Sequence, residues 1–178
     1  KLNHPNIVYL YGITIDPSTN QPSIVMEYMV NGSLYRLLHS GEALSWRRRY
    51  QIARDVASGL AALHEYSIIH RDLKSPNVLL YEQGTRAKLT DFGLSRMKTE
   101  SSTTKQITGS ARWMPPEQMI KVGEKVKYDK SSDVYSYAMI LYELSSGCVP
   151  FDDMSDDLQI MYAIKDGHRP NIPADCSE

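Results

Sequence analysis

The chain has 178 residues, of which 42% are hydrophobic, and its 20 basic and 21 acidic side chains give a formal net charge of −1. This length and composition suit a globular protein with one core or two small lobes. The balanced charge excludes a general attraction to nucleic acids or to anionic membrane surfaces. Any anion that the protein binds must therefore be held by a local site.

The two cysteines, Cys148 and Cys176, lie far apart in the sequence and form no metal-ligand motif, as expected in a reducing compartment. No apolar run approaches the roughly 20 residues that a membrane-spanning helix needs. The opening residues, KLNHPNIVYL, do not resemble a signal peptide. The sequence therefore predicts a cytoplasmic protein with no membrane segment in this chain.

The first third of the chain has the composition of β-strands followed by a short helix. Residues 6–13 (NIVYLYGI) and 23–29 (SIVMEYM) are β-rich and flank DPSTNQP, a run of turn formers, so they predict a β-hairpin. Gly32 and the N-cap candidate Ser33 then precede LYRLL, whose three leucines share one helical face. A short helix is expected there.

Three longer helices are predicted further along the chain. Residues 46–66 repeat aliphatic side chains at spacings of four, four and three, the pattern of an amphipathic helix. Residues 131–147 are apolar almost all round and end at a glycine, which predicts a helix buried on most sides at the centre of the core. Residues 155–167 begin at the cap candidate Ser155 and end at another glycine, so a surface helix is expected.

A second hairpin is predicted where NVLLY and RAKLT flank EQGT, and polar residues lie at its two ends. Asp72 and Asn77 lie at one end, and Asp91 follows the other. The hairpin can bring these oxygen ligands together, and hard oxygen donors suit Mg²⁺ that shares substrate phosphates. With Lys74 as a nearby cation, the group can orient a hydroxyl, hold a metal and neutralise a moving charge, as phosphoryl transfer requires.

Three motifs in this order resemble the signature of the eukaryotic protein kinases: HRDLKSPN at residues 70–77, DFG at 91–93 and MPPE at 114–117. The resemblance extends from HPNIV near the start to RPNIP near the end. RWMPPE and SDVYSYAMILYEL are similar to the tyrosine-kinase-like branch of the Ser/Thr kinases. The resemblance implies an α+β, protein-kinase-like fold, with a mostly helical C-terminal lobe and a remnant of the N-terminal lobe sheet.

Within such a fold, residues 1–29 are expected to form the end of the N-lobe and the hinge. Residues 30–178 would form an incomplete C-lobe that lacks the last helices. The family's Gly-rich phosphate loop and strand lysine should precede the first residues, and no Gly-x-Gly-x-x-Gly occurs in the chain. The resemblance therefore implies a partial protein kinase domain over residues 1–178, which we expect to be inactive on its own.

The resemblance also implies roles for individual residues. Asp72 resembles the catalytic base, which orients the substrate hydroxyl and accepts its proton, and Lys74 would face the transferred phosphate. HRDLKSPN, residues 70–77, resembles the family's catalytic loop. Asn77 in this loop and Asp91 resemble the ligands of the Mg²⁺ that accompanies ATP. Phe92 is similar to the residue whose packing distinguishes active from inactive arrangements.

The stretch VMEYMVNGSL resembles the hinge with which kinases bind ATP. The backbone of Glu27 and Met29 would bond the adenine edge, and Met26 would gate the pocket behind it. Leu79 is similar to the apolar residue beneath the adenine ring. Taken from the residues alone, the methionines could equally be core fillers and Leu79 an ordinary strand residue.

Arg71 is similar to the arginine with which kinases hold a phosphate on the activation loop, whereas His70 is expected to be structural. The polar segment 95–111 supplies candidate phosphate acceptors for an upstream kinase or for self-phosphorylation. They are Thr99, Ser101, Ser102, Thr103, Thr104 and Thr108. The alternative is that this segment is only a solvated loop.

The implied activity is ATP-dependent phosphorylation of Ser/Thr hydroxyls on protein substrates, as part of signalling. Lys74 and Ser110 fit the Ser/Thr pattern, and Ser110 and Glu117 are expected to position the substrate. Two alternatives stay open: a protein tyrosine kinase, and a catalytically dead kinase or pseudokinase that acts as a binding or scaffold module. No nucleic-acid partner is expected.

Overall fold

The computed structural model describes residues 2–92, 111–119, 128–174 and 176. In chain order its strands and helices are β1 (Leu10–Ile15), β2 (Pro22–Met26), α1 (Leu34–Leu38), α2 (Trp46–Glu65), β3 (Val78–Tyr81), β4 (Arg86–Leu89), α4 (Lys130–Ser146) and α5 (Asp157–Lys165). Short 3₁₀ turns cover Ser75–Asn77, Ala111–Trp113 and Pro116–Gln118. This is the predicted α+β fold. None of the helices in the described residues is long and apolar enough to cross a bilayer.

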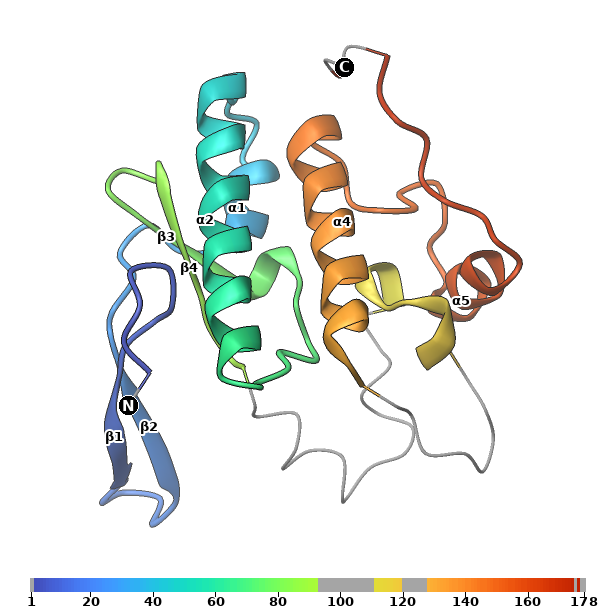
Figure 1. Ribbon diagram of the computed structural model, residues 1–178. Helices are drawn as coiled ribbons and strands as arrows, with labels where there is room; N and C mark the ends of the chain where they lie inside the picture. Colours follow the sequence, from blue (N-terminus) through green and yellow to red (C-terminus); the bar gives the residue numbers. More distant parts are fainter. Residues whose placement is uncertain (1, 93–110, 120–127, 175, 177–178) are drawn as a thin grey trace.

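The first predicted hairpin is present and projects away from the helices (Figure 1). Its turn forms where the sequence predicts it, because Asp16 Oδ1 accepts a hydrogen bond from the backbone N–H of Ser18 at 2.8 Å. Such side-chain-to-backbone bonds are what make aspartate a turn former. The hairpin itself is largely open to solvent, with Ile13 at 73% exposure.

The first strand begins later than the sequence predicts. Asn6 and Val8 pair with β4 instead of β2: the N–H of Val8 donates to the carbonyl of Leu89, and the N–H of Leu89 donates to the carbonyl of Asn6, both at 2.9 Å. The side-chain amide of Asn6 also donates to the carbonyl of Ala87 at 3.0 Å. Because this segment is buried between β4 and α2, its backbone groups need partners there.

The second predicted hairpin, β3 and β4, is present, with Val78 opposite Leu89. A buried carboxylate on α2 holds it in place. Asp55, which is 2% exposed, accepts hydrogen bonds from Arg86 Nε at 2.8 Å and from the backbone N–H of Ala87 at 3.0 Å. The hairpin therefore has a fixed position against α2, and with it the polar residues at its ends.

The main core lies where α2 and α4 run side by side (Figure 1). α4 begins at the N-cap Asp129 and ends at Gly147, whose φ of 73° is the left-handed conformation of a helix stop. The prediction that this helix is buried on most sides holds only in part. Val134 is 55% exposed and Leu141 39% exposed, because α4 has neighbours on some of its sides and solvent on others.

The last helix, α5, starts one residue later than predicted. Its N-cap is Asp156 and not Ser155, because the Asp156 carboxylate accepts hydrogen bonds from the backbone N–H groups of Leu158 and Gln159. Aspartate and serine are both strong N-cap residues, so two adjacent candidates cannot be ranked by residue type. The predicted existence of the helix is confirmed.

At Gly59, α2 packs tightly against the segment that precedes β1. A Cβ at this position would lie 2.5 Å from the carbonyl oxygen of Asn6. We expect Gly59→Ala to lower the free energy of unfolding by about 1–3 kcal/mol, although alanine favours helices, because the Asn6 backbone is held by its pairing with β4. Urea denaturation measures the change. For comparison, Gly12→Ala would meet nothing within 4 Å, and an equal loss at both positions would contradict the steric explanation.

Candidate active site

The entrance to the predicted catalytic loop is held by a buried carboxylate on α4. Asp133, 1% exposed, accepts hydrogen bonds from the backbone N–H groups of His70 at 2.8 Å and Arg71 at 2.9 Å. Nε2 of His64, near the end of α2, lies 2.8 Å from the same carboxylate. These bonds fix a sharp change of direction, in which Arg71 takes the left-handed φ of 71° that non-glycine residues seldom adopt.

The loop then brings together the three polar residues that the sequence singles out. Lys74 Nζ lies 3.0 Å from Asp72 Oδ1. Asn77 Nδ2 donates to the Asp72 carbonyl at 2.7 Å and to Asp72 Oδ2 at 3.2 Å. The side chain of Asp72 is 34% exposed, so this carboxylate is both oriented by its neighbours and open to an incoming molecule.

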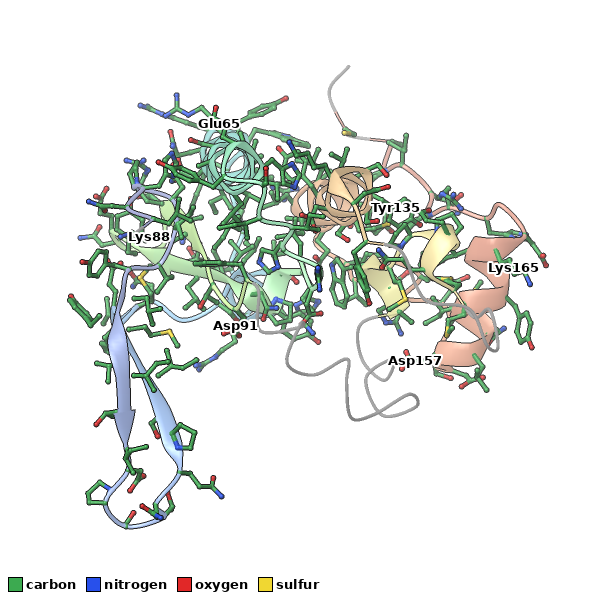
Figure 2. All side chains as sticks on the ribbon, turned by 60° about the horizontal axis from the view of Figure 1, so that its bottom comes forward. Glu65, Lys88, Asp91, Tyr135, Asp157 and Lys165 are labelled. Atoms are coloured by element: carbon green, nitrogen blue, oxygen red, sulfur yellow. The ribbon has the colours of Figure 1, made fainter. Side chains whose placement is uncertain are left out.

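Asp91 follows β4, whose last residue pairs with the first residue of β3 next to Asn77. The N–H of Thr90 donates to the carbonyl of Asn77 at 3.0 Å, which places the residue before Asp91 directly beside the catalytic loop. Asp91 lies just beyond β4, is exposed, and has a left-handed φ of 61° (Figure 2). The hairpin therefore brings the backbone of Asn77 close to the residue that precedes Asp91.

Asn77 and Asp91 suit Mg²⁺ in the chemistry of their donors. Both hydrogen bonds of Asn77 use Nδ2, so neither occupies Oδ1, the amide atom that can ligate a cation. In the part of the chain that the structure describes, no group of three or more His, Cys, Asp or Glu side chains is arranged to hold a metal. The two residues would therefore share the ion with oxygens of a phosphate group and water.

His70 lies beneath these residues and is fully buried. Burial lowers the pKa of its imidazole, and the negative charges of Asp133, Asp72 and Asp91 oppose that shift. Neither ring nitrogen has a hydrogen-bond partner among the described residues. A neutral, enclosed ring of this kind fits the expected structural role and not that of a base.

The predicted hinge is tied to β4 through the side chain of Glu27. Its carboxylate accepts hydrogen bonds from Lys88 Nζ at 2.7 and 2.8 Å and from the backbone N–H of Tyr9 at 3.2 Å. Burial acts to raise the pKa of Glu27, but the bonds from Lys88 and Tyr9 outweigh it and lower the pKa. Lys88 occupies an ordinary position in the second hairpin (Figure 2), and no sequence pattern marks it as the partner of Glu27.

The other predicted adenine contacts occupy different environments. Met29 is 8% exposed and belongs to the buried residues, whereas Met26 is 38% exposed. Thr90 Oγ1 contacts Met26 Sδ at 3.8 Å, so the end of β2 touches the residue that precedes Asp91. Leu79 is half-buried on β3, where it pairs with Ser33 at the start of α1. The core-filler alternative therefore suits Met29 better than Met26.

A second buried acid on α4, Glu143, was also missed. Its Oε1 accepts a hydrogen bond from Ser75 Oγ at 2.6 Å, and its Oε2 accepts one from Trp113 Nε1 at 2.7 Å. Burial raises the pKa of this carboxyl to about 7, while both hydrogen bonds act in the opposite direction. The available signal was one acid within the apolar run AMILYEL, residues 138–144 of α4.

The segment around Trp113 is fastened from a second side by Arg112. Its guanidinium donates to the backbone carbonyls of Pro150 at 2.7 Å, Phe151 at 2.5 Å and Met154 at 2.7 Å. These carbonyls belong to the connection between α4 and α5. The residues just before the MPPE motif are therefore fixed to the body of the molecule.

The remaining predicted residues are described in part. The guanidinium of Arg71 lies over the ring of Tyr128, 5.5 Å from its centroid, a cation–π contact. Phe92 is half-buried and packs against the core, and Glu117 is exposed. All the candidate phosphate acceptors from Thr99 to Thr108, and Ser110, lie outside the described residues.

Comparison with known families agrees with this geometry. Residues 1–178 match the family described as protein tyrosine and serine/threonine kinase. The chain belongs to this kinase family. The three motifs and the α+β fold are therefore those of a kinase chain, as the sequence predicts.

Individual relatives carry kinase names as well. The chain is 40% identical over its whole length to a probable serine/threonine-protein kinase, pats1, of Dictyostelium discoideum, and covers 6% of that protein. It is 38% identical over 97% of its length to the serine/threonine-protein kinase STY17 of Arabidopsis thaliana, covering 29%. It is 35% identical over 99% to the dual specificity protein kinase pyk3 of D. discoideum, covering 12%. The chain thus spans less than a third of each of these relatives.

The loop entrance should depend on both oxygens of Asp133. We expect Asp133→Asn to lower the free energy of unfolding by about 2–4 kcal/mol, because the amide group presents an N–H₂ to a buried backbone N–H that has lost its acceptor. Amide hydrogen exchange at His70 and Arg71 should accelerate more than at residues within α2. The exposed acid Asp153 supplies the control, Asp153→Asn. Unchanged exchange at both loop amides would show that Asp133 does not hold the loop.

Glu143 should make stability depend on pH. Since its pKa is raised from 4.5 to about 7, the folded state binds a proton that the unfolded state releases, and the free energy of unfolding falls as pH rises between these values. We expect a loss of about 3 kcal/mol across this window relative to Glu143→Gln, which does not titrate. His70 has the opposite pH dependence but is present in both proteins, so its effect cancels. Urea denaturation at about pH 5 and about pH 8 tests this, and a constant difference would refute it.

Proposed function

We propose that this chain forms part of an ATP-dependent kinase that phosphorylates Ser/Thr hydroxyls of proteins. The observation that carries the proposal is the placement of Lys74 and Asn77 against the carboxylate of Asp72. Asp91 approaches the same loop through the bond from Thr90 to Asn77. A cluster of this composition positions groups and stabilises charge, and phosphoryl transfer needs both.

Asp72 would orient the substrate hydroxyl and accept its proton as the oxygen attacks the terminal phosphorus of ATP. The bond from phosphorus to the bridging oxygen breaks, and ADP leaves with the bonding electrons. Lys74, next to the base, would neutralise charge on the phosphoryl group during the transfer. Because Asp72 is bonded from both sides and still 34% exposed, it can hold a fixed orientation while remaining accessible to a peptide.

The nucleotide would be held from two sides. The backbone of Glu27 and Met29 would bond the adenine edge, with Met26 at the back of the pocket and Leu79 beneath the ring. Asn77 Oδ1 and the Asp91 carboxylate would hold Mg²⁺, which neutralises the phosphate charge when bound. The bond between Glu27 and Lys88 supports this assignment, because it leaves the hinge backbone at a fixed place beside β4.

Regulation and substrate recognition would lie in the segment that follows Asp91. Arg71 would exchange its contact with Tyr128 for a phosphate on Ser102, Thr103, Thr104 or Thr108, and the position of Phe92 would change with it. Ser110 and Glu117 would help to receive the peptide. In this proposal residues 1–29 are the end of the N-lobe and the hinge, and residues 30–178 belong to the C-lobe.

Tyrosine phosphorylation is the second candidate, and the observation in its favour is the relative named as a dual specificity protein kinase. A catalytically dead scaffold is less well supported, because the chain retains the proposed base Asp72, the adjacent Lys74 and both proposed metal ligands. The two enzymatic candidates differ only in the acceptor hydroxyl. Parallel assays with serine, threonine and tyrosine peptides on one sequence background separate them.

The proposed base provides the sharpest test of activity. In the gene product that carries this chain, Asp72→Asn should lower kcat for transfer to a serine peptide by about 10²–10⁴-fold, because the amide cannot accept the proton. Binding of ATP should change by less than about threefold, since Asp72 would not touch the adenine. Steady-state transfer assays and nucleotide titrations measure the two quantities, with Asp153→Asn as the exposed acid control. Undiminished transfer by the Asp72 variant would exclude this residue as the base.

A further inference from the structure

Glu143 connects two parts of the molecule that are distant in sequence. Ser75 directly follows Lys74 in the catalytic loop, and Trp113 lies in the segment that leads into the MPPE motif. α4 lies between these two parts (Figure 1), and the carboxylate of Glu143 is 0% exposed. One side chain therefore forms a hydrogen-bonded bridge from the loop to the segment.

Each oxygen of the bridge has its own donor. Oε1 receives the hydroxyl of Ser75 at 2.6 Å, and Oε2 receives the indole N–H of Trp113 at 2.7 Å. The carbonyl of Trp113 also accepts a hydrogen bond from Ser136 Oγ at 2.8 Å, so the tryptophan is held by two side chains of α4. A buried carboxylate keeps such geometry because any displacement would leave a polar group without a partner.

We propose that Glu143 is a positioning residue that couples two segments. One is the segment around Trp113, which would receive the peptide, and the other is the catalytic loop. The inference rests on the proposed kinase function and extends it to a residue to which the sequence patterns assign no role. Movement of Trp113 when a peptide binds would pass through the carboxylate to Ser75, and from there to the adjacent Lys74. Peptide binding and the placement of the catalytic groups would therefore be energetically linked.

The chemistry of the two donors predicts which substitutions preserve the bridge. The indole N–H can only donate, whereas a serine hydroxyl can also accept. In Glu143→Gln the amide oxygen can accept from Trp113 while the amide N–H₂ donates to Ser75, so both contacts survive with one reversed. In Glu143→Leu both contacts are lost. Glutamine should therefore retain coupling, and leucine should abolish it.

A double-mutant cycle tests the coupling in the gene product that carries this chain. Ser75→Ala and Trp113→Phe each remove one end of the bridge, and each should lower kcat/KM for a serine peptide by about tenfold. Because either change already breaks the bridge, the double variant should lose far less than the product of the single losses. In the Glu143→Leu background, adding Ser75→Ala should have almost no further effect, whereas Glu143→Gln should stay within about threefold of the wild type.

The matched control is Tyr137→Phe. Tyr137 lies on the same helix and donates a hydrogen bond to the carbonyl of Ala53 at 3.1 Å, away from the catalytic loop. This variant also removes one partly buried hydrogen bond from α4. We expect kcat and KM for the peptide to change by less than about twofold. An equal loss of kcat/KM in Tyr137→Phe would mean that these changes act only by destabilising the helix. If the loss in the double variant Ser75→Ala, Trp113→Phe equals the product of the two single losses, the proposed coupling is refuted.

A readout that does not require catalysis separates this inference from the proposed function. The chain has two tryptophans, so Trp46→Phe leaves Trp113 as the single indole in an NMR spectrum of this chain. We expect Ser75→Ala to shift the indole N–H resonance of Trp113, and Tyr137→Phe to leave it in place. An unmoved resonance in Ser75→Ala refutes the bridge whatever the activity. If Ser75→Ala shifts the resonance but the wild-type gene product shows no phosphoryl transfer, the kinase function is refuted and the bridge is confirmed.

Discussion

The arrangement of the candidate active site depends on two backbone amides that donate to one buried carboxylate. Asp133 receives the N–H groups of His70 and Arg71, and this contact sets the direction in which the chain enters the catalytic loop. A buried charge is expensive unless several donors surround it, and here the donors are the loop itself together with His64. The loop amides stabilise the buried carboxylate of Asp133, and the carboxylate in turn stabilises the conformation of the loop.

The same helix holds the loop at a second point. Asp133 lies near the start of α4 and Glu143 near its end, and they bind the entrance and the middle of the catalytic loop respectively. On the opposite side, Asp55 of α2 fixes β4, which leads to Asp91. The two halves of the candidate site are thus positioned by buried acids on two helices that pack against each other. The apolar core sets the distance between these two helices. Hydrogen bonds from the acids on the helices then fix the positions of the loop and of β4.

Much of the fold could be predicted from local sequence patterns, because helical periodicity and turn formers act over a few residues. The second hairpin and the gathering of Asp72, Lys74 and Asn77 are of this kind. Pairing across long distances could not be predicted in this way: nothing near Asn6 indicates that its partner is β4. The roles of Asp133 and Glu143 were hidden for a similar reason, since an acid within an apolar pattern shows that it is buried but does not name its donors.

The ion pair between Glu27 and Lys88 bears on how this protein can vary among its relatives. Because the Glu27 carboxylate is paired with Lys88, the side chain at position 27 is constrained by its neighbour on β4. The proposed adenine contact would therefore use the backbone of this residue alone. The neighbouring Tyr28 is 88% exposed, so packing does not constrain its side chain in this way. Across related chains, positions 27 and 88 should therefore change together as a pair, whereas position 28 should drift independently of both.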